Sequence, residues 1–536
     1  MTTPLLKWTG HPLADVGVAT LCAMVGKTDP EKLTLEDLDV AGKEIKAAYT
    51  DGVMTSYLTC VYMNAPYVQP NMKKDEFARK VARLTTPHRV PPDPEAEGLR
   101  CAFTGAPATL VLKRSEMPML LGEGYFNFYP AGIAGLPLTA AFGLAIHALA
   151  LGGRRSEGKL LIVHCDDPAY TLQFANQYLA DNRRIIEMAR SGELPSMDDP
   201  GQVLTREMPG GLNKEKRAKY PDAKGPESLV MSDLVKIITA RKSGSMADSS
   251  VSVTAYHMSN SGQGPSLAIF NIPGEFVEFL STLHGAEMGA KWARLVQRSW
   301  RAGKGGVDSD EPDATDDVPV KKARKKTAKP AARSGAGFSR NDLYNDLLAI
   351  FIHGSCDWQA ATRFIRRHLL SDPTKYYFDS GKALNQAPRF GVEQLDLIDW
   401  KLTALFLQKV LGMNKERIEL IKDFAAKLAE LIDDHNDKRL FRQLVFTNGE
   451  WQYRALLTKA QRQYTFDRDK LPFTFDEYIE VFLNADPDER AGWSLIRDLI
   501  SIRLVEVLHQ KGFFKRNADV LANEEEEAET TTPVEV

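Results

Sequence analysis

The sequence predicts an α+β fold, with a mixed α/β N-terminal part followed by an all-α helical bundle. Three short apolar runs of strand type lie between helical patterns in the first three hundred residues, at 159–164, 251–256 and 267–272. From residue 341 onward, apolar residues recur at helical spacing almost throughout. The expected parts are an N-terminal domain at 1–302, a disordered charged linker at 303–338, a helical bundle at 339–523 and an acidic tail at 524–536.

The composition is typical of a soluble globular protein. The 536 residues suffice for roughly two to four domains, and 43% hydrophobic and 26% charged residues are ordinary values. No apolar run reaches the ~18 residues of a membrane span, and residues 1–10 lack a secretory signal, so we expect a cytoplasmic protein without a membrane partner. Because 68 basic residues nearly balance 71 acidic ones, any affinity for nucleic acid must come from local patches.

The cysteines are scattered and form no C-x-x-C pair. This argues against a disulfide framework and against a zinc ribbon, so we expect small buried side chains, no metal and no cofactor. The five residues are Cys22, Cys60, Cys101, Cys165 and Cys356.

The first three hundred residues carry clear helix boundaries. Pro12 suits the first turn of a helix that has Gly26 just past its end, and Thr34 with Asp37 has the spacing of a capping box. An apolar run at 136–151 predicts a helix closed by a pair of glycines. Further expected elements are helices at 75–84, 169–190 and 274–301, a strand at 108–113 and a polar segment at 195–228.

The linker and the C-terminal part differ in character. Between 303 and 337 acidic residues give way to basic ones, and such a stretch cannot bury enough apolar surface to become ordered. Helices are expected after it at 342–353, 357–370, 392–411, 415–435, around 454–463 and at 489–509.

Residues 122–137 set aromatic side chains and an amide among glycines, just before an apolar helix. The glycines permit close backbone approach, Tyr125 and Tyr129 can stack on bases, and Asn127 can hydrogen-bond to a base edge. This favours a surface for flat, polar ligands. Alternating aromatic residues are also typical of a buried strand with one wet face, and both interpretations stay open.

A second loop of amide and hydroxyl groups, at 258–265, holds Asn260, Ser261 and Gln263. Basic side chains elsewhere in this part can contact phosphates, because each such contact adds affinity without reading sequence. A solvated charged face is the alternative explanation. The basic candidates are Lys113, Arg114, Lys214, Lys216 and Arg217.

One cluster of titratable residues, His164, Asp166 and Asp167, stands at the end of the predicted strand 159–164. Strand ends often carry active sites, so a metal-dependent hydrolase acting on nucleic acid is an alternative function. However, neighbouring residues of a strand point to opposite faces, and no H-E-x-x-H, P-loop or G-x-S-x-G motif accompanies them. The aspartates before Pro168 are more simply explained as a turn and a helix cap.

Four motifs occur in order in the N-terminal part. They are Trp8-Thr-Gly-His-Pro-Leu-Ala-Asp-Val-Gly17, Cys101-Ala-Phe-Thr-Gly105, Asn127-Phe-Tyr-Pro-Ala-Gly132 with Gly135-Leu-Pro137, and Ser259-Asn-Ser-Gly-Gln-Gly-Pro265. Together they resemble the large subunit of type I CRISPR-Cas interference complexes, in the branch of types I-A and I-B. The resemblance covers residues 5–300 through motifs, and the helical remainder matches in character and length.

The resemblance implies a non-catalytic subunit of Cascade, the RNA-guided surveillance complex, beside the five-prime handle of the crRNA. Such a subunit recognises the protospacer-adjacent motif (PAM) in target double-stranded DNA and initiates R-loop formation, while the guide reads the target. Its helical bundle would hold the displaced strand and help recruit the helicase-nuclease. Its other partners would be the Cascade backbone and handle-binding subunits. Asn127 and the loop at 260–263 are then candidates for PAM reading.

Two further expectations follow from the resemblance. Relatives often carry a second cysteine three residues after the position of Cys101, where this chain has Thr104, so we predict no structural zinc. In related type I-B systems the bundle is also made separately as a small subunit from an internal translation start, for which Met413 is the candidate. A structural scaffold without nucleic-acid contact is a third interpretation of the chain.

Overall fold

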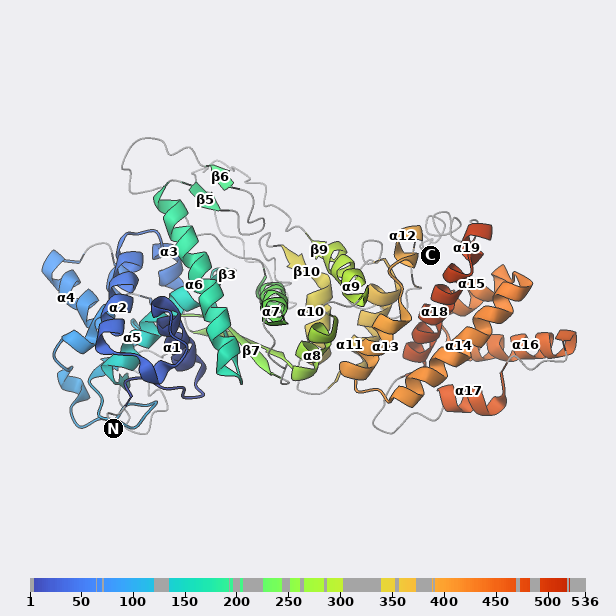
Figure 1. The fold of residues 1–536 in the computed structure, drawn as a ribbon, viewed down its shortest axis with the longest axis horizontal. Coiled ribbons are helices and arrows are strands. Elements are labelled where there is room, and N and C mark those ends of the chain that lie inside the picture. Colours follow the sequence, from blue (N-terminus) through green and yellow to red (C-terminus); the bar gives the residue numbers. More distant parts are fainter. Residues whose placement is uncertain are drawn as a thin grey trace, which may run out of the picture.

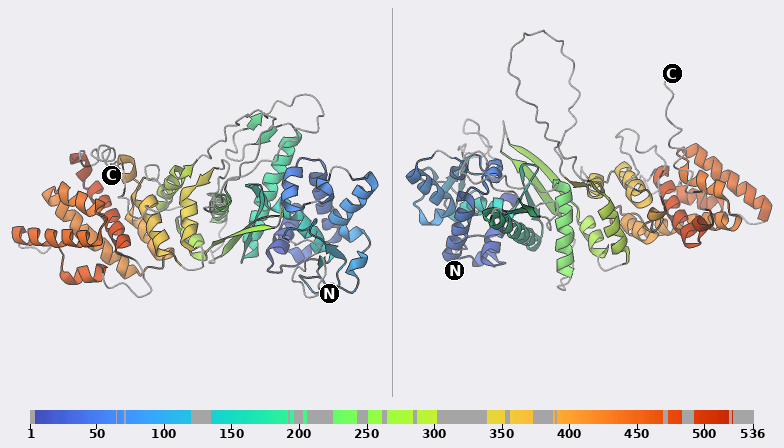
Figure 2. Two further views of the ribbon diagram at one scale, coloured as in Figure 1. Left: turned by 180° about the vertical axis from the view of Figure 1, so that it is seen from behind. Right: turned by 90° about the horizontal axis from the view of Figure 1, so that it is seen from above.

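The computed structural model describes residues 4–520 with internal gaps. The residues outside the description are 1–3, 64, 70–71, 120–134, 192, 196–202, 206–224, 243–250, 261–264, 284–286, 302–338, 352–355, 373–387, 389–390, 469–472, 483–491, 518–519 and 521–536. The molecule is elongated, with the N-terminal helices at one end and the C-terminal helices at the other (Figure 1). The views from behind and from above show the same elongated arrangement of the described helices (Figure 2).

Helix α5, Ala140–Gly152, is the centre of the N-terminal part. It contains no Asp, Glu, Lys or Arg and is buried from Ala141 onward, as expected of a helix enclosed on all sides. Thr139 caps it by accepting a hydrogen bond from the backbone N–H of Phe142. The helices packed around it are α1 (Pro12–Val25), α2 (Leu35–Thr50), α3 (Thr55–Val61), α4 (Lys74–Thr85) and α6 (Pro168–Arg190), joined by the 3-10 turns η1 (Pro30–Lys32), η2 (Pro66–Val68), η3 (Pro87–Arg89) and η4 (Pro94–Ala96).

A four-stranded antiparallel sheet in the order β3-β4-β7-β8 leads from the N-terminal part toward the middle of the molecule (Figure 1). Its strands are β3 (Arg154–Ser156), β4 (Lys159–Cys165), β7 (Val253–Ser259) and β8 (Ser266–Ile272). In β8, exposed and half-buried residues alternate, so this edge strand has one solvated face. Three two-stranded ladders pair β1 (Leu110–Leu112) with β2 (Leu136–Leu138), β5 (Glu193–Pro195) with β6 (Val203–Thr205), and β9 (Trp300–Arg301) with β10 (Arg340–Asn341).

Two large apolar clusters fill most of the described interior, beside a small third one formed by Ala96, Ala108 and Val111. One lies among the helices α1 to α6. The other begins at Leu161 of β4 and continues through α7 (Pro226–Lys242), α8 (Gly274–Leu283) and α9 (Glu287–Arg298) to Phe513 near the C-terminus. Helices before and after the segment 302–338 therefore share one core, and the domain boundary expected there does not coincide with a break in it.

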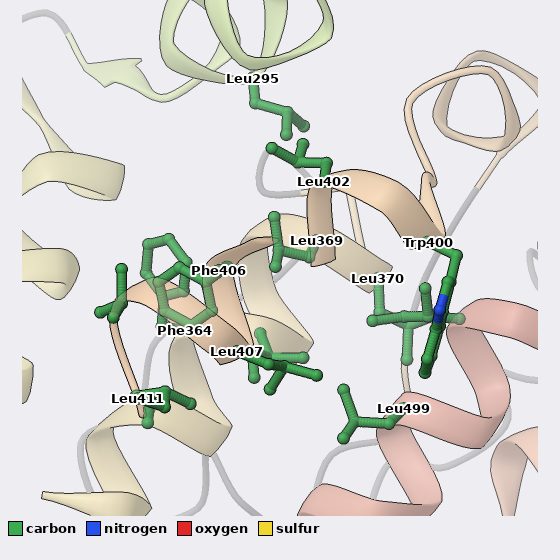
Figure 3. Packing of buried hydrophobic residues seen from close by; sticks show 14 of the residues in the cluster. Leu295, Phe364, Leu369, Leu370, Trp400, Leu402, Phe406, Leu407, Leu411 and Leu499 are labelled. Carbon is green, nitrogen blue, oxygen red and sulfur yellow. The ribbon is translucent and has the colours of Figure 1, made fainter. Parts of the chain in front are cut away.

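Figure 3 shows this shared cluster at close range. Leu295 of α9 lies beside Leu402 of α13 (Trp400–Lys409). The rings of Phe364 and Phe406 stack with their centroids 4.9 Å apart. Burying side chains of this size contributes about 1.5–3 kcal/mol each, so apolar packing holds together the chain segments on both sides of residues 302–338.

The C-terminal helices pack around α14 (Lys415–His435) and α18 (Trp493–Gln510). Within α18, Asp498 accepts hydrogen bonds from Arg366 at 2.8 Å and from Arg497 at 2.6 Å, and none of these side chains is more than 1% exposed. The remaining elements are α10 (Asp342–Leu348), η5 (Ala349–Phe351), α11 (Trp358–Phe364), the π-helical η6 (Ile365–Leu370), α12 (Val392–Leu395), α15 (Lys438–Phe446), α16 (Glu450–Arg468), α17 (Phe475–Phe482) and α19 (Phe513–Arg516).

The predicted α+β class is confirmed, and so is the capping box. The N–H of Thr34 donates to the Asp37 carboxylate at 2.7 Å, while the Thr34 hydroxyl accepts the N–H of Asp37 at 3.3 Å. The helix start predicted at 136 is wrong, because residues 136–138 pair with β1 and the helix begins only after Thr139.

Further elements also differ from the sequence patterns. The polar segment expected at 195–228 gives way to α7 at Pro226, and neither α7 nor α15 is predicted. The helix expected at 274–301 is two helices, α8 and α9, followed by β9. The linker at 303–338 and the tail at 524–536 lie outside the described residues.

Candidate nucleic-acid interface

Asn260, predicted to read a base, is buried directly after β7 with 1% exposure. Its side-chain amide is engaged by the chain that leads into residues 120–134. The oxygen Oδ1 accepts the N–H of Met119 at 2.8 Å, and Nδ2 donates to the carbonyl of Met117 at 3.0 Å. The structure therefore assigns this amide to positioning the chain rather than to contacting a base edge.

The two loops predicted to contact DNA each begin directly after a described residue, and these two residues, Met119 and Asn260, are hydrogen-bonded to each other. Residues 120–134 follow Met119 directly, and residues 261–264 follow Asn260 directly. On the return side, Gly135 lies against β1, since a Cβ atom there would be 2.6 Å from a methyl group of Val111. The roots of both loops are thus fixed to the same framework.

The described parts of the first three motifs also contact one another. His11 of the first motif packs its ring on Phe103 of the second, with the centroids 4.9 Å apart. The backbone N–H of Ala102 donates to the carbonyl of Pro137, at the end of the third motif, at 2.9 Å. Motifs that are distant in sequence therefore meet beside α5.

Gly17 places α1 directly on α5. A Cβ atom at this position would lie 2.2 Å from the carbonyl oxygen of Ala145, which is far inside van der Waals contact. Gly152 makes a similar approach, because its Cβ would lie 1.7 Å from the hydroxyl of Thr20. The glycine that ends the first motif is explained by helix packing.

Asp15 holds the chain that precedes α1. Its carboxylate accepts hydrogen bonds from the N–H and hydroxyl of Thr9, both at 2.7 Å, and lies 3.3 Å from Nε2 of His164. Burial alone would raise the pKa of Asp15, but hydrogen bonds from His164, Thr9 and Gly10 outweigh it and keep the pKa below its usual value. Burial lowers the pKa of His11, in spite of the nearby Asp15 carboxylate.

The residues of the hydrolase alternative do not converge on one point. His164 faces Asp15, Asp166 is exposed, and Asp167 caps α6 by accepting the N–H of Ala169 at 2.8 Å. Within the described residues, no three His, Cys, Asp or Glu side chains gather closely enough to hold a metal ion. The arrangement provides a positioned loop and a helix cap, not an acid and base that face one substrate.

Lys113 and Arg114 directly follow β1. The Lys113 ammonium lies 3.2 Å from the carboxylate of Glu95 at the surface, a type of pair that contributes only ~0–1 kcal/mol and exchanges easily for a phosphate. Beside it is a hollow of about 380 Å³, and the described walls of this hollow carry both signs of charge. The charged residues of these walls are Lys80, Arg83, Asp93, Glu95, Lys113 and Glu116.

The other predicted contact residues lie outside the described part of the chain, and their predictions stand as made. They are Tyr125, Asn127, Tyr129, Lys214, Lys216, Arg217, Ser261 and Gln263.

A surface on α16 was not predicted. Trp451 and Phe466, with 79% and 88% exposure, lie on one side of this helix and line a shallow hollow of about 690 Å³. The lining residues, which we call the α16 face, are Trp451, Arg454, Ala455, Thr458, Lys459, Arg462, Gln463 and Phe466. The spacing of 451, 455, 458, 462 and 466 places these residues on one helix side, so a search for aromatic and basic residues at helical spacing would have found it.

No family model, curated protein or solved structure matches this chain. Among the described helices, none combines the length and the apolar character that crossing a bilayer requires.

Proposed function

We propose that this chain is the non-catalytic large subunit of a type I CRISPR Cascade complex, which recognises the PAM duplex, initiates R-loop formation and helps recruit the helicase-nuclease. The observation that carries the proposal is the junction between Met119 and Asn260. It joins the roots of two loops that are rich in glycine and amide groups, so both loops can act on one short stretch of duplex.

In this proposal the two loops divide the work of recognition. Phosphate contacts set the register of a protein on DNA, whereas base-edge contacts carry the sequence information. Asn260 positions both loops and contacts no base. Base reading is assigned to Asn127, Ser261 and Gln263, stacking at an opened step to Tyr125 and Tyr129, and phosphate contact to Lys113, Arg114, Lys214, Lys216 and Arg217.

The experiment is performed in the assembled complex with crRNA. A variant with Asn127→Ala, Ser261→Ala and Gln263→Ala is compared with Asn271→Ala, which removes an exposed amide from β8 of the same sheet. We expect the triple variant to lose at least tenfold in discrimination between DNA with and without the PAM, and the control to retain it. Unchanged discrimination in the triple variant would refute the assignment of base reading.

The C-terminal helices are proposed to lie along the displaced strand, both in the full chain and in a separate small subunit that starts at Met413. A chain that starts there would contain α14 to α19 and would lose Arg366, but Asp498 would keep Arg497 as its partner. A C-terminal tag in the native operon should reveal a short second product that disappears with Met413→Leu. A single full-length band in the unmodified operon would contradict this.

The hydrolase alternative has less support, because His164, Asp166 and Asp167 point to different neighbours. Purification separates the candidates. RNA of uniform length that copurifies with several proteins from the cytoplasm would support a Cascade subunit, and metal-dependent turnover by the isolated chain would support a hydrolase. If the chain shows neither copurifying RNA nor turnover, a structural scaffold is the remaining explanation.

A further inference from the structure

The α16 face combines exposed aromatic rings with uncompensated positive charge. Its lining residues include Arg454, Lys459 and Arg462 and no carboxylate. Arg454 pairs with Glu450 on the same helix, whereas Lys459 and Arg462 form no salt bridge within the described residues. Large apolar side chains beside free cations are typical of a surface that binds an acidic partner with apolar character.

A second hollow, of about 250 Å³, lies on the seam between α15 and α16 and shares Lys459 and Gln463 with the α16 face. Its wall also carries Arg439 from α15 and Asp437 from the turn before it. The Asp437 carboxylate accepts hydrogen bonds from the Tyr464 hydroxyl at 2.8 Å and from the N–H of Leu440 at 2.9 Å. The two hollows therefore adjoin at Lys459 and Gln463, and apart from Asp437 their charged lining residues are basic.

The C-terminal end of the described chain lies beside this seam. The amide Nδ2 of Asn517 donates to Oδ1 of Asn436 at 2.5 Å, and Asn436 directly precedes Asp437 of the seam. Val520, the last described residue, is buried and donates its N–H to the carbonyl of Asn517 at 3.1 Å. Whatever follows Val520 thus starts next to the seam.

The residues that follow are the most acidic run in the sequence. Glutamate stands at 524, 525, 526, 527 and 529, with no basic residue between 521 and 536. An extended chain covers ~3.3–3.6 Å per residue, so residue 529 can lie about 30 Å from Val520. The α16 face from Trp451 to Phe466 is about 22 Å long at 1.5 Å per residue, which is within this reach.

We propose that the acidic segment 524–529 of this chain binds intramolecularly along the α15–α16 seam and the α16 face. Its carboxylates would pair with Arg439, Lys459 and Arg462, and its peptide backbone would cover the exposed ring of Trp451. The segment then competes with any other polyanion for the same cations. If the proposed function is correct, the displaced DNA strand is one of the polyanions that compete with the segment.

The test uses the full chain alone, so its outcome does not depend on the proposed function. A carbodiimide couples a glutamate carboxylate to a lysine amine only when the two are in contact. We expect mass spectrometry to find Lys459 coupled to residues 524–529 at least tenfold more often than Lys401, an exposed lysine on α13. In 1 M salt, where the Debye length is ~3 Å, this coupling should fall strongly.

Two results would overturn the proposal. One is coupling of Lys459 no greater than that of Lys401. The other is coupling between the light and heavy chains of an isotope-labelled mixture, which would show contact between copies.

A second measurement keeps the test independent of crosslinking chemistry. In the variant with Glu→Gln at 524–527 and 529, acrylamide quenching of the Trp451 fluorescence should rise at least twofold. The Trp451 signal is obtained by subtracting the fluorescence of the same chain with Trp451→Phe. The variant should also bind a single-stranded oligothymidine several-fold more tightly than the full chain. Equal quenching in both backgrounds would refute the contact, and equally tight oligothymidine binding by both chains would refute the competition.

Discussion

The backbone N–H of Met119 donates to the side-chain oxygen of Asn260 at 2.8 Å, although these residues are 141 positions apart in sequence. An amide of this kind is suited to reading DNA, yet here both of its ends are occupied by the protein backbone, at Met117 and Met119. These hydrogen bonds fix the distance between Met119 and Asn260, from which the two loops start. An amide that used the same atoms to bind a base could not fix that distance.

Replacing Asn260 should affect stability before it affects specificity. Asn260→Ala leaves the part-buried N–H of Met119 and the buried carbonyl of Met117 without this side-chain amide, which costs about 1–3 kcal/mol in the free energy of unfolding. Denaturant titration of the full chain measures the change, with Asn271→Ala as the exposed control expected to stay within about 0.5 kcal/mol. An equal effect of both substitutions would show that the Asn260 junction contributes nothing.

Gly17→Ala should separate α1 from α5. The new methyl group would meet the carbonyl oxygen of Ala145, a backbone atom that cannot rotate away, so we expect a loss of about 1–3 kcal/mol despite the gain in helix propensity. Gly143→Ala is the matched control, because its methyl group would meet the end of the Leu110 side chain and no backbone atom. The midpoint temperature of thermal unfolding should be considerably higher for the Gly143 variant than for the Gly17 variant.

Asp498→Asn should be severely destabilising. It removes the carboxylate charge that Arg366 and Arg497 share in the interior, and breaking a buried pair in this way costs about 3–5 kcal/mol. Asp433→Asn removes a carboxylate that pairs with the exposed Arg516 and should cost less than about 1 kcal/mol. Urea unfolding of both variants checks this, and the midpoint should fall much further for Asp498→Asn than for Asp433→Asn. Similar midpoints would contradict the role given to Asp498.

His147 should make the protein sensitive to acid. Burial lowers its pKa to about 3, while the hydroxyl of Tyr67 lies 3.0 Å from Nδ1. As pH falls, the His147 ring becomes protonated in the unfolded chain at a higher pH than in the folded protein. The contribution of the neutral ring to the free energy of unfolding is therefore fully present above about pH 6.5. It is lost as pH falls toward 3, by at most about 1.4 kcal/mol per pH unit.

The measurement is urea unfolding between pH 7 and pH 4. His147→Gln should flatten the dependence of the unfolding free energy on pH, whereas Tyr67→Phe removes one hydrogen bond and keeps the titrating ring. If His147→Gln retains the full slope, the acid sensitivity comes from other groups.

Local signals in the sequence predict local structure well. The capping box at Thr34 is found because both partners lie within one helical turn. Helix α7 is missed because it is enclosed by other elements, so Leu229, Val230, Met231 and Leu234 are all buried and no apolar stripe marks it.

The candidate site is predicted only in part, for a related reason. The glycines and amides of the loops are visible in the sequence, but the role of Asn260 depends on a partner from a distant segment. The Ala102 to Pro137 hydrogen bond and the packing of His11 on Phe103 are likewise products of the tertiary fold. Residue type alone therefore did not distinguish an amide that holds the chain from one that reads DNA.

The short ladder between β9 and β10 has a practical consequence for the charged segment that it brackets. Asn341 lies opposite Trp300, and its side chain also donates to the carbonyl of Val296 at 2.8 Å. The two ends of residues 302–338 are therefore clamped together by the folded protein itself. A single proteolytic cut in this segment should leave both fragments migrating as one particle, and the same place should tolerate an inserted fluorescent domain.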